Sequence, residues 1–150
     1  MPRHNSMNWI IASVAAQFAL LIYLQVHEWI HLPRWNGGKD NSQGRLDVIL
    51  GVVQIGFIVG VAIEWMPAMA LALVVYAAWL ALQLVGWWIP YLRGASEAHL
   101  RYYERHWAGT WRFLPAIGDH PVPNAAHVIL QALIVASLGT TGAALAAGTM

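Results

Sequence analysis

The sequence predicts an all-α integral membrane protein: a bundle of four transmembrane helices with an additional amphipathic interfacial helix in the third loop. Hydrophobic residues make up 59% of the 150 residues and charged residues only 10%. A soluble domain carries roughly a quarter charged residues, so this composition excludes an ordinary water-soluble fold. Four apolar stretches of about 20 residues follow one another, and each can cross about 30 Å of hydrocarbon. We expect one membrane domain, residues 1–150.

The first predicted span covers residues 9–31 and ends before Pro33 and a glycine-rich loop. A secretory signal peptide is the alternative for an apolar stretch this close to the N terminus. Signal peptides have a shorter apolar region followed by a cleavage site of small residues, and neither feature is found here. We therefore predict a retained helix.

The other three predicted spans cover residues 47–65, 68–89 and 124–148. A short proline turn joins the second span to the third, which makes them a hairpin, and Pro90 closes the third span. Asn124 is a residue type that caps helix N termini, so the fourth span is predicted to begin there.

The positive charges predict the orientation. Seven of the eight Lys and Arg residues lie in two predicted loops, residues 32–46 and 90–123, and Arg3 is the exception. The positive-inside rule assigns these loops to the cytoplasm and both termini to the outside. Tryptophans concentrate at the boundaries of the spans, as in an interfacial aromatic belt. We expect a protein integral to the bacterial inner (plasma) membrane.

The long third loop contains an amphipathic pattern over residues 96–111. Aromatic and apolar residues recur at helical spacing on one face, and charged residues occupy the rest of the helix surface. This pattern predicts a helix that lies on the inner leaflet, and the alternative is a helix packed on the first loop. The defining residues are Arg101, Tyr103, Arg105, Trp107 and Trp111.

An H-E-x-x-H pattern, formed by His27, Glu28 and His31, lies at the cytoplasmic end of the first predicted span. Histidines at i and i+4 share one face of a helix and can bind one Zn²⁺, while the glutamate can act as general base on a metal-bound water. Ionisable residues are costly in a membrane, which favours a functional site. An equally weighted alternative is that these residues are solvated at a helix end and hydrogen-bond to lipid headgroups.

Two further histidines are candidate third ligands. His127 lies in the first turn of the fourth span, and His120 lies in the segment before it. Either can complete three protein ligands with one open position, as a catalytic zinc site requires. The chain has no cysteine, so Zn²⁺ or another divalent metal depends on His, Asp or Glu. Ligation of haem by the histidines stays open.

The five residues from His27 to His31 resemble the H-E-x-x-H motif of membrane-embedded metalloproteases of the site-two class. Those enzymes carry the motif in a transmembrane helix near the cytoplasmic face. They take a further ligand from an Asp that precedes Gly in a later span, whereas Asp47 of this chain precedes Val48. The resemblance covers these five residues.

A glutamine occurs on each predicted span at a similar depth, about 10 Å below the cytoplasmic boundary at about 1.5 Å per helical residue. Buried amides need partners in hydrocarbon, so interhelical pairs would fix the rotation of the helices. The functional alternative is that the layer forms the floor of a polar cavity beneath the histidines. The four residues are Gln25, Gln54, Gln83 and Gln131.

Two classes of function follow from these features. The first is a histidine-rich pocket at the cytoplasmic face that binds a metal and hydrolyses a substrate, with Glu28 as base. The second is a non-catalytic accessory or structural subunit of a membrane complex that binds a tetrapyrrole or a lipid. Expected partners are the bilayer, anionic headgroups near the basic loops, and a second copy or another membrane protein. Nothing in the sequence favours nucleic-acid binding.

Overall fold

The computed structural model describes residues 2–37 and 44–149. Loop residues 38–43 and the side chain of Asp47 lie outside that description. In the described part, all regular structure is helical. The long helices are α1 (Pro2–Trp29), α3 (Gly44–Ala62), α4 (Met66–Gln83) and α7 (Ala125–Gly148). The short ones are α2 (Pro33–Asn36), the π-helix η1 (Leu84–Trp88), α5 (Ile89–Arg93) and α6 (Glu97–Trp107).

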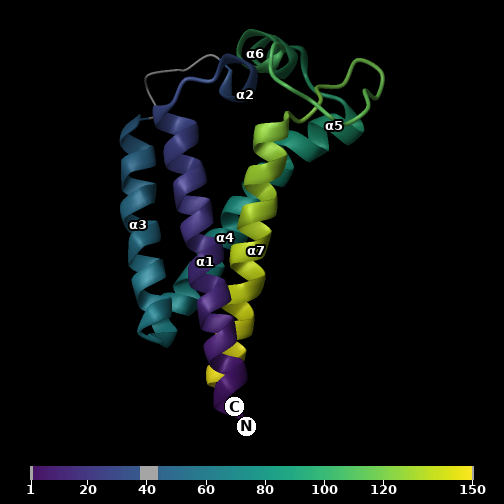
Figure 1. The fold of residues 1–150 in the computed structure, drawn as a ribbon. Helices are drawn as coiled ribbons and strands as arrows, with labels where there is room; N and C mark the ends of the chain where they lie inside the picture. The colour runs from purple at the N-terminus through teal and green to yellow at the C-terminus, as the bar shows by residue number, and fades with distance from the viewer. Residues whose placement is uncertain (1, 38–43, 150) are drawn as a thin grey trace.

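The four long helices pack side by side. α1 contacts both α3 and α7, and α4 contacts the same two helices. Figure 1 shows both chain termini at one end of the molecule, which we call the terminal end. α2, α5 and α6 lie at the opposite end, which we call the loop end.

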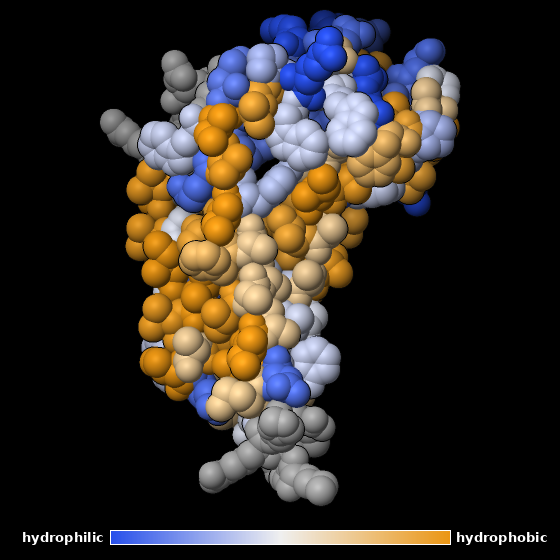
Figure 2. All heavy atoms as spheres, in the orientation of Figure 1, coloured by the Kyte–Doolittle hydropathy of each residue, from blue (hydrophilic) through white to orange (hydrophobic). Residues whose placement is uncertain are grey.

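Three segments are long and apolar enough to cross a membrane, and they indicate a membrane protein. They are Ser6–Trp29, Met66–Arg93 and Ala125–Gly148. The apolar stretch described for α3, Val48–Ala62, is shorter. Figure 2 shows an apolar flank along the long helices and hydrophilic residues gathered at the loop end. The surface therefore changes from membrane-like to water-like at this end.

The helix of the third predicted span continues past Pro90 to Arg93. Proline normally ends or kinks a helix because it lacks an N–H and its ring collides with the carbonyl four residues earlier. Here the π-helix η1 widens the turn, and the N–H of Ile89 bonds to the carbonyl of Leu84 five residues before it. The helix bends instead of ending, and Figure 1 shows α5 projecting away from the bundle.

A network of buried polar side chains lies among the apolar residues of the bundle. Gln17 of α1 donates from Nε2 to Ser13 Oγ at 3.1 Å and to Thr141 Oγ1 of α7 at 3.0 Å. Its Oε1 accepts from the hydroxyl of Tyr76 on α4 at 3.1 Å. We call Ser13, Gln17, Tyr76 and Thr141 the Gln17 network. It joins three helices and leaves no polar atom of the Gln17 side chain unbonded.

Candidate functional site

Helix α1 ends at Trp29, between the two histidines of the H-E-x-x-H pattern. The side chain of Asn36 explains this end, because its Nδ2 donates to the carbonyls of His27 at 2.7 Å and Ile30 at 2.6 Å. Carbonyls at a helix C terminus lack partners within the helix, so Asn36 stabilises the termination. His31 therefore lies outside the helix, and the expectation of two histidines on one helical face is wrong.

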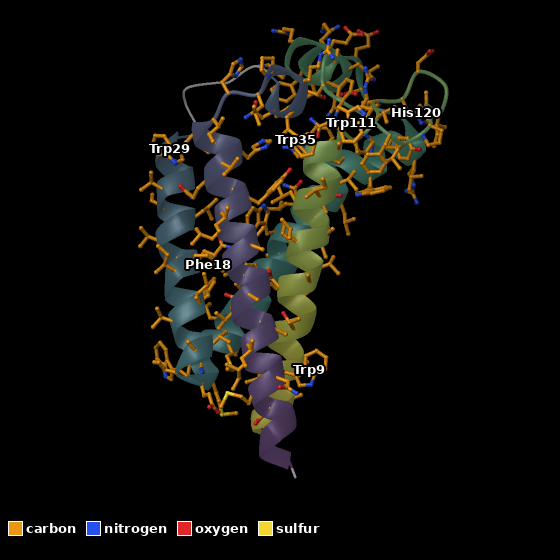
Figure 3. The ribbon with its side chains drawn as sticks, in the orientation of Figure 1. Trp9, Phe18, Trp29, Trp35, Trp111 and His120 are labelled. Carbon is orange, nitrogen blue, oxygen red and sulfur yellow. The ribbon has the colours of Figure 1, made fainter. Side chains whose placement is uncertain are left out.

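The structure brings two of the four candidate metal ligands, His27 and His127, close together and places the other two elsewhere. The ring centroids of His27 and His127 lie 6.2 Å apart. His31 lines a shallow groove beside α6, together with Glu104. His120 hydrogen-bonds through Nδ1 to the carbonyl of Tyr91 at 2.7 Å, and Figure 3 places it at the outer edge of the loop end.

Among the side chains that the structure describes, those of residues 6–37 and 48–149, no group of three or more His, Asp or Glu could hold a metal ion. The zinc site expected from His27, His31 and either His127 or His120 has no support in this geometry. The expected role of Glu28 as general base depends on a metal-bound water and stays a prediction.

A cavity of about 430 Å³ lies at the loop end, between α1, α4, η1, α6 and α7. This volume falls within the range of small-molecule sites, about 300 to 1,000 Å³. Figure 2 shows a hollow between the hydrophilic loop end and the apolar flank. The lining residues are Leu24, His27, Glu28, Asn36, Leu50, Trp79, Gln83, Gly86, Trp87, His99, Tyr102, Tyr103, His106, Trp107, His127 and Leu130.

Helix α6 covers the loop end of the cavity with aromatic side chains. Tyr103 is buried, with 6% of its surface exposed, and its hydroxyl donates to the carbonyl of Val122 at 2.8 Å. The ring centroid of Trp107 lies 5.7 Å from that of Trp87 and 4.8 Å from that of His127. This aromatic face therefore packs on protein.

Helix α6 also packs on the first loop, which is the alternative that the sequence left open. Gly37 of that loop has a φ of +64°, which an L side chain rarely adopts, and a Cβ there would collide with the backbone oxygen of His106. The charged side chains of α6 are exposed. Arg101 pairs with Glu97 at 3.1 Å, and Arg105 donates from Nε to the backbone carbonyl of Arg101.

The predicted helix over residues 96–111 is shorter in the structure and ends at Trp107. Trp111 follows the helix, so its assignment to the interfacial helix is wrong. Its backbone N–H donates to the carbonyl of Arg34 at 2.7 Å, and its carbonyl accepts from Ala125 at 2.8 Å. Trp111 thus ties the first loop to the start of α7, and its ring lies 6.0 Å from that of Trp35 (Figure 3).

The four glutamines of the expected layer do not hydrogen-bond to one another among the described residues. Gln25 accepts from the indole of Trp29, and Gln131 accepts from the indole of Trp88 at 2.7 Å. Gln54 donates to a backbone carbonyl of α1. Gln83 lines the cavity, and its buried Oε1 has no partner among the described residues. The layer is thus a set of different contacts, one of which belongs to the cavity wall.

The tautomer of His127 follows from its neighbour Asn124. The backbone N–H of His127 can only donate, so the Asn124 atom 2.9 Å from it is the side-chain oxygen. The same oxygen lies 2.7 Å from His127 Nδ1, which must therefore carry a proton. In the neutral ring, Nε2 is then the hydrogen-bond acceptor. The helix cap thereby fixes which nitrogen of this cavity residue carries the lone pair.

Burial raises the pKa of the Tyr103 hydroxyl above its ordinary value of 10.0. The positive charge of Arg112 and the hydrogen bond to Val122 oppose this shift but do not cancel it. The guanidinium carbon of Arg112 lies 5.9 Å from the centre of the Tyr103 ring. Tyr103 is therefore a neutral hydrogen-bond donor at ordinary pH.

No protein-family model, curated protein or solved structure shows a significant match to this chain.

The sequence analysis did not single out two residues that shape the site or hold the helices around it. The local sequence could have indicated the role of Asn36. It stands between Trp35 and two glycines shortly after a predicted span, where a polar side chain can cap the helix. The position of Gln17 was also informative, because an amide in the middle of an apolar stretch needs partners from other helices. The partners themselves were not predictable from the local sequence.

Proposed function

We propose that this chain is a non-catalytic, membrane-embedded binding protein whose cavity holds a small amphipathic molecule. The observation that carries this proposal is the cavity of about 430 Å³ at the loop end. Leucines line part of its wall, whereas imidazole, indole, phenol, amide and carboxylate groups line most of the rest. A wall that combines apolar surface with a few polar groups is typical of small-molecule sites.

The proposal includes four transmembrane spans, with α3 (Gly44–Ala62) as the second. At about 1.5 Å per residue its 19 residues extend about 28 Å, close to the hydrocarbon thickness. The termini share one end of the molecule, as an even number of crossings requires (Figure 1). With the basic loops in the cytoplasm, the cavity lies at the cytoplasmic side of a bacterial inner membrane.

Position supports an amphipathic ligand. The cavity lies where the apolar flank gives way to the hydrophilic loop end (Figure 2). Leu24, Leu50 and Leu130 come from the long helices, while His99 and His106 come from α6. A molecule with an apolar tail and a polar head therefore matches both parts of the wall.

Gly86 provides a direct test. It lines the cavity, and a Cβ added there meets no atom within 4 Å. Gly86→Phe should therefore place a ring in the cavity from a position where the Cβ itself meets no clash. Gly139 on α7 also has open space around its Cβ but does not line the cavity, so Gly139→Phe is the matched control.

The measurement is native mass spectrometry of the purified protein, with solvent extraction to identify retained small molecules. We expect a bound molecule in the unmodified chain and in Gly139→Phe, and its loss in Gly86→Phe. Equal occupancy in both variants would contradict the proposal. A Soret absorbance that Gly86→Phe removes would identify the bound molecule as a tetrapyrrole, which His127 would help to hold through Nε2. Stoichiometric zinc with loss of binding in His27→Ala would restore the metal-site prediction.

A further inference from the structure

The charged groups of the cavity wall differ from those of the surrounding surface. The loop end carries five described arginines, and none of them lines the cavity; they are Arg34, Arg93, Arg101, Arg105 and Arg112. The wall does include the carboxylate of Glu28. Among the described residues, no ion pair includes Glu28. With neutral histidines, the formal charge of the described wall is therefore negative, whereas the arginines of this end lie outside it together with Glu97, Glu104 and Asp119.

The aromatic residues of the wall add partial negative charge. The ring planes of Trp87 and Trp107 lie 74° apart, and those of Trp87 and Tyr103 lie 73° apart. These are edge-to-face contacts, and the Trp87 ring also lies against His127, with ring centroids 3.9 Å apart. The faces of indole and phenol rings attract cations, most strongly at sites shielded from water. Aromatic rings that share a cavity wall with the Glu28 carboxylate favour a positively charged head group.

One further group of the wall can accept a hydrogen bond. His127 lines the cavity, and Nε2 is the acceptor of its neutral ring. A protonated amine supplies both the positive charge and the N–H donors.

We infer that the ligand of the cavity is an amphipathic organic cation, with a protonated amine as its head and an apolar chain as its tail. This inference rests on the proposed function, because it names the ligand class of the same cavity. Glu28 neutralises the head group, the aromatic rings of the wall add to the attraction, and His127 Nε2 accepts one of its N–H groups. The tail lies along the leucines of the long helices.

Three probes with one chain length test the inference: octylammonium, octanol and octyl sulfate. Binding is followed by tryptophan fluorescence of the full chain in nanodiscs of zwitterionic lipid. The pH is kept at about 8, where histidine is neutral by its ordinary pKa of about 6.5 and an alkylamine is protonated. We expect octylammonium to bind at least about tenfold more tightly than either other probe, with Gly86→Phe removing the difference.

Glu28→Gln should weaken octylammonium binding about tenfold and leave octanol binding unchanged. Glu104→Gln is the matched control, because Glu104 lies on exposed α6 at the same end and outside the cavity wall. Equal or tighter binding of octyl sulfate or octanol, still removed by Gly86→Phe, would overturn the cation inference and leave the binding cavity standing. No binding of any probe that depends on Gly86 would overturn both.

Discussion

Two glutamines in neighbouring parts of the same bundle have opposite surroundings. Gln17 is fully buried and both ends of its amide are hydrogen-bonded, to Ser13 and Thr141 on one side and to Tyr76 on the other. Gln83 lines the cavity and its Oε1 has no partner among the described residues. The first amide holds helices together, whereas the oxygen of the second forms no hydrogen bond among the described residues.

This difference separates a part of the bundle that holds helices together from the part that carries the cavity. Helix association in a bilayer depends on packing and interhelical hydrogen bonds, because lipid tails are as apolar as leucine. The Gln17 network supplies such bonds between α1, α4 and α7. The loop end can then keep a cavity, whose lost packing contacts lower stability locally.

The same substitution at both glutamines should separate the two roles. Gln17→Leu removes bonds to three side chains and should lower the free energy of unfolding by about 2 kcal/mol, with probe binding unchanged. Gln83→Leu should change the free energy of unfolding by less than about 0.5 kcal/mol and weaken octylammonium binding about threefold. Unfolding is measured in mixed micelles by circular dichroism. If both variants lose stability equally, the functional contrast between these regions is wrong.

Asn124→Ala should have a smaller effect on stability and should act on the cavity as well. Loss of the helix cap is expected to cost about 1 kcal/mol. It also removes the oxygen that holds the proton on His127 Nδ1, so nitrogen NMR should show a shift from one tautomer to a mixture. Asn124→Asp, which keeps an acceptor for the His127 N–H, is the control for the cap. An unchanged His127 spectrum in Asn124→Ala would contradict the assigned tautomer.

The smallest expected change in the free energy of unfolding is at Tyr103, on the helix α6 that covers the cavity. Its pKa is raised in the folded state, so the unfolded chain releases the proton first as the pH rises above 10. The contribution of Tyr103 to stability is thus complete below pH 10 and falls as the pH rises through the folded pKa. Tyr103→Phe should cost about 0.5 to 1 kcal/mol at neutral pH, through the lost bond to Val122.

The readout for Tyr103 is the difference in free energy of unfolding between the unmodified chain and Tyr103→Phe, measured from neutral to alkaline pH. This difference should shrink above pH 10. A difference that stays constant with pH would show that the hydroxyl does not ionise differently in the two states.

Much of the fold could be predicted from the sequence because its signals are local. The apolar stretches of the sequence correctly located three helices that are long enough to cross a membrane. Asn124 was correctly predicted as the cap of α7. Local rules failed where the tertiary structure opposed them. Pro90 does not end its helix, because η1 widens the turn before it. The helix expected to reach Trp111 ends at Trp107, where the chain turns back toward the first loop.

The candidate site was predicted only in part. The sequence indicated a histidine-rich pocket, and His27 and His127 do line one cavity. It grouped His31 and His120 with them, yet neither lines that cavity. The spacing of His27 and His31 predicts a shared face only if the helix continues, and Asn36 stabilises its end between them. A capping bond from a residue of the following loop is not visible in a five-residue motif.

By itself, the sequence determined that this chain suits a bilayer, where its apolar stretches lie, and which end is basic. These properties depend on composition and on spacing within one helix, so no knowledge of neighbours is needed. Only the tertiary structure decided which polar groups are bonded and which face a cavity. The reason is that a hydrogen bond between helices joins residues distant in sequence, such as Gln17 and Thr141, whose approach depends on how all the helices pack.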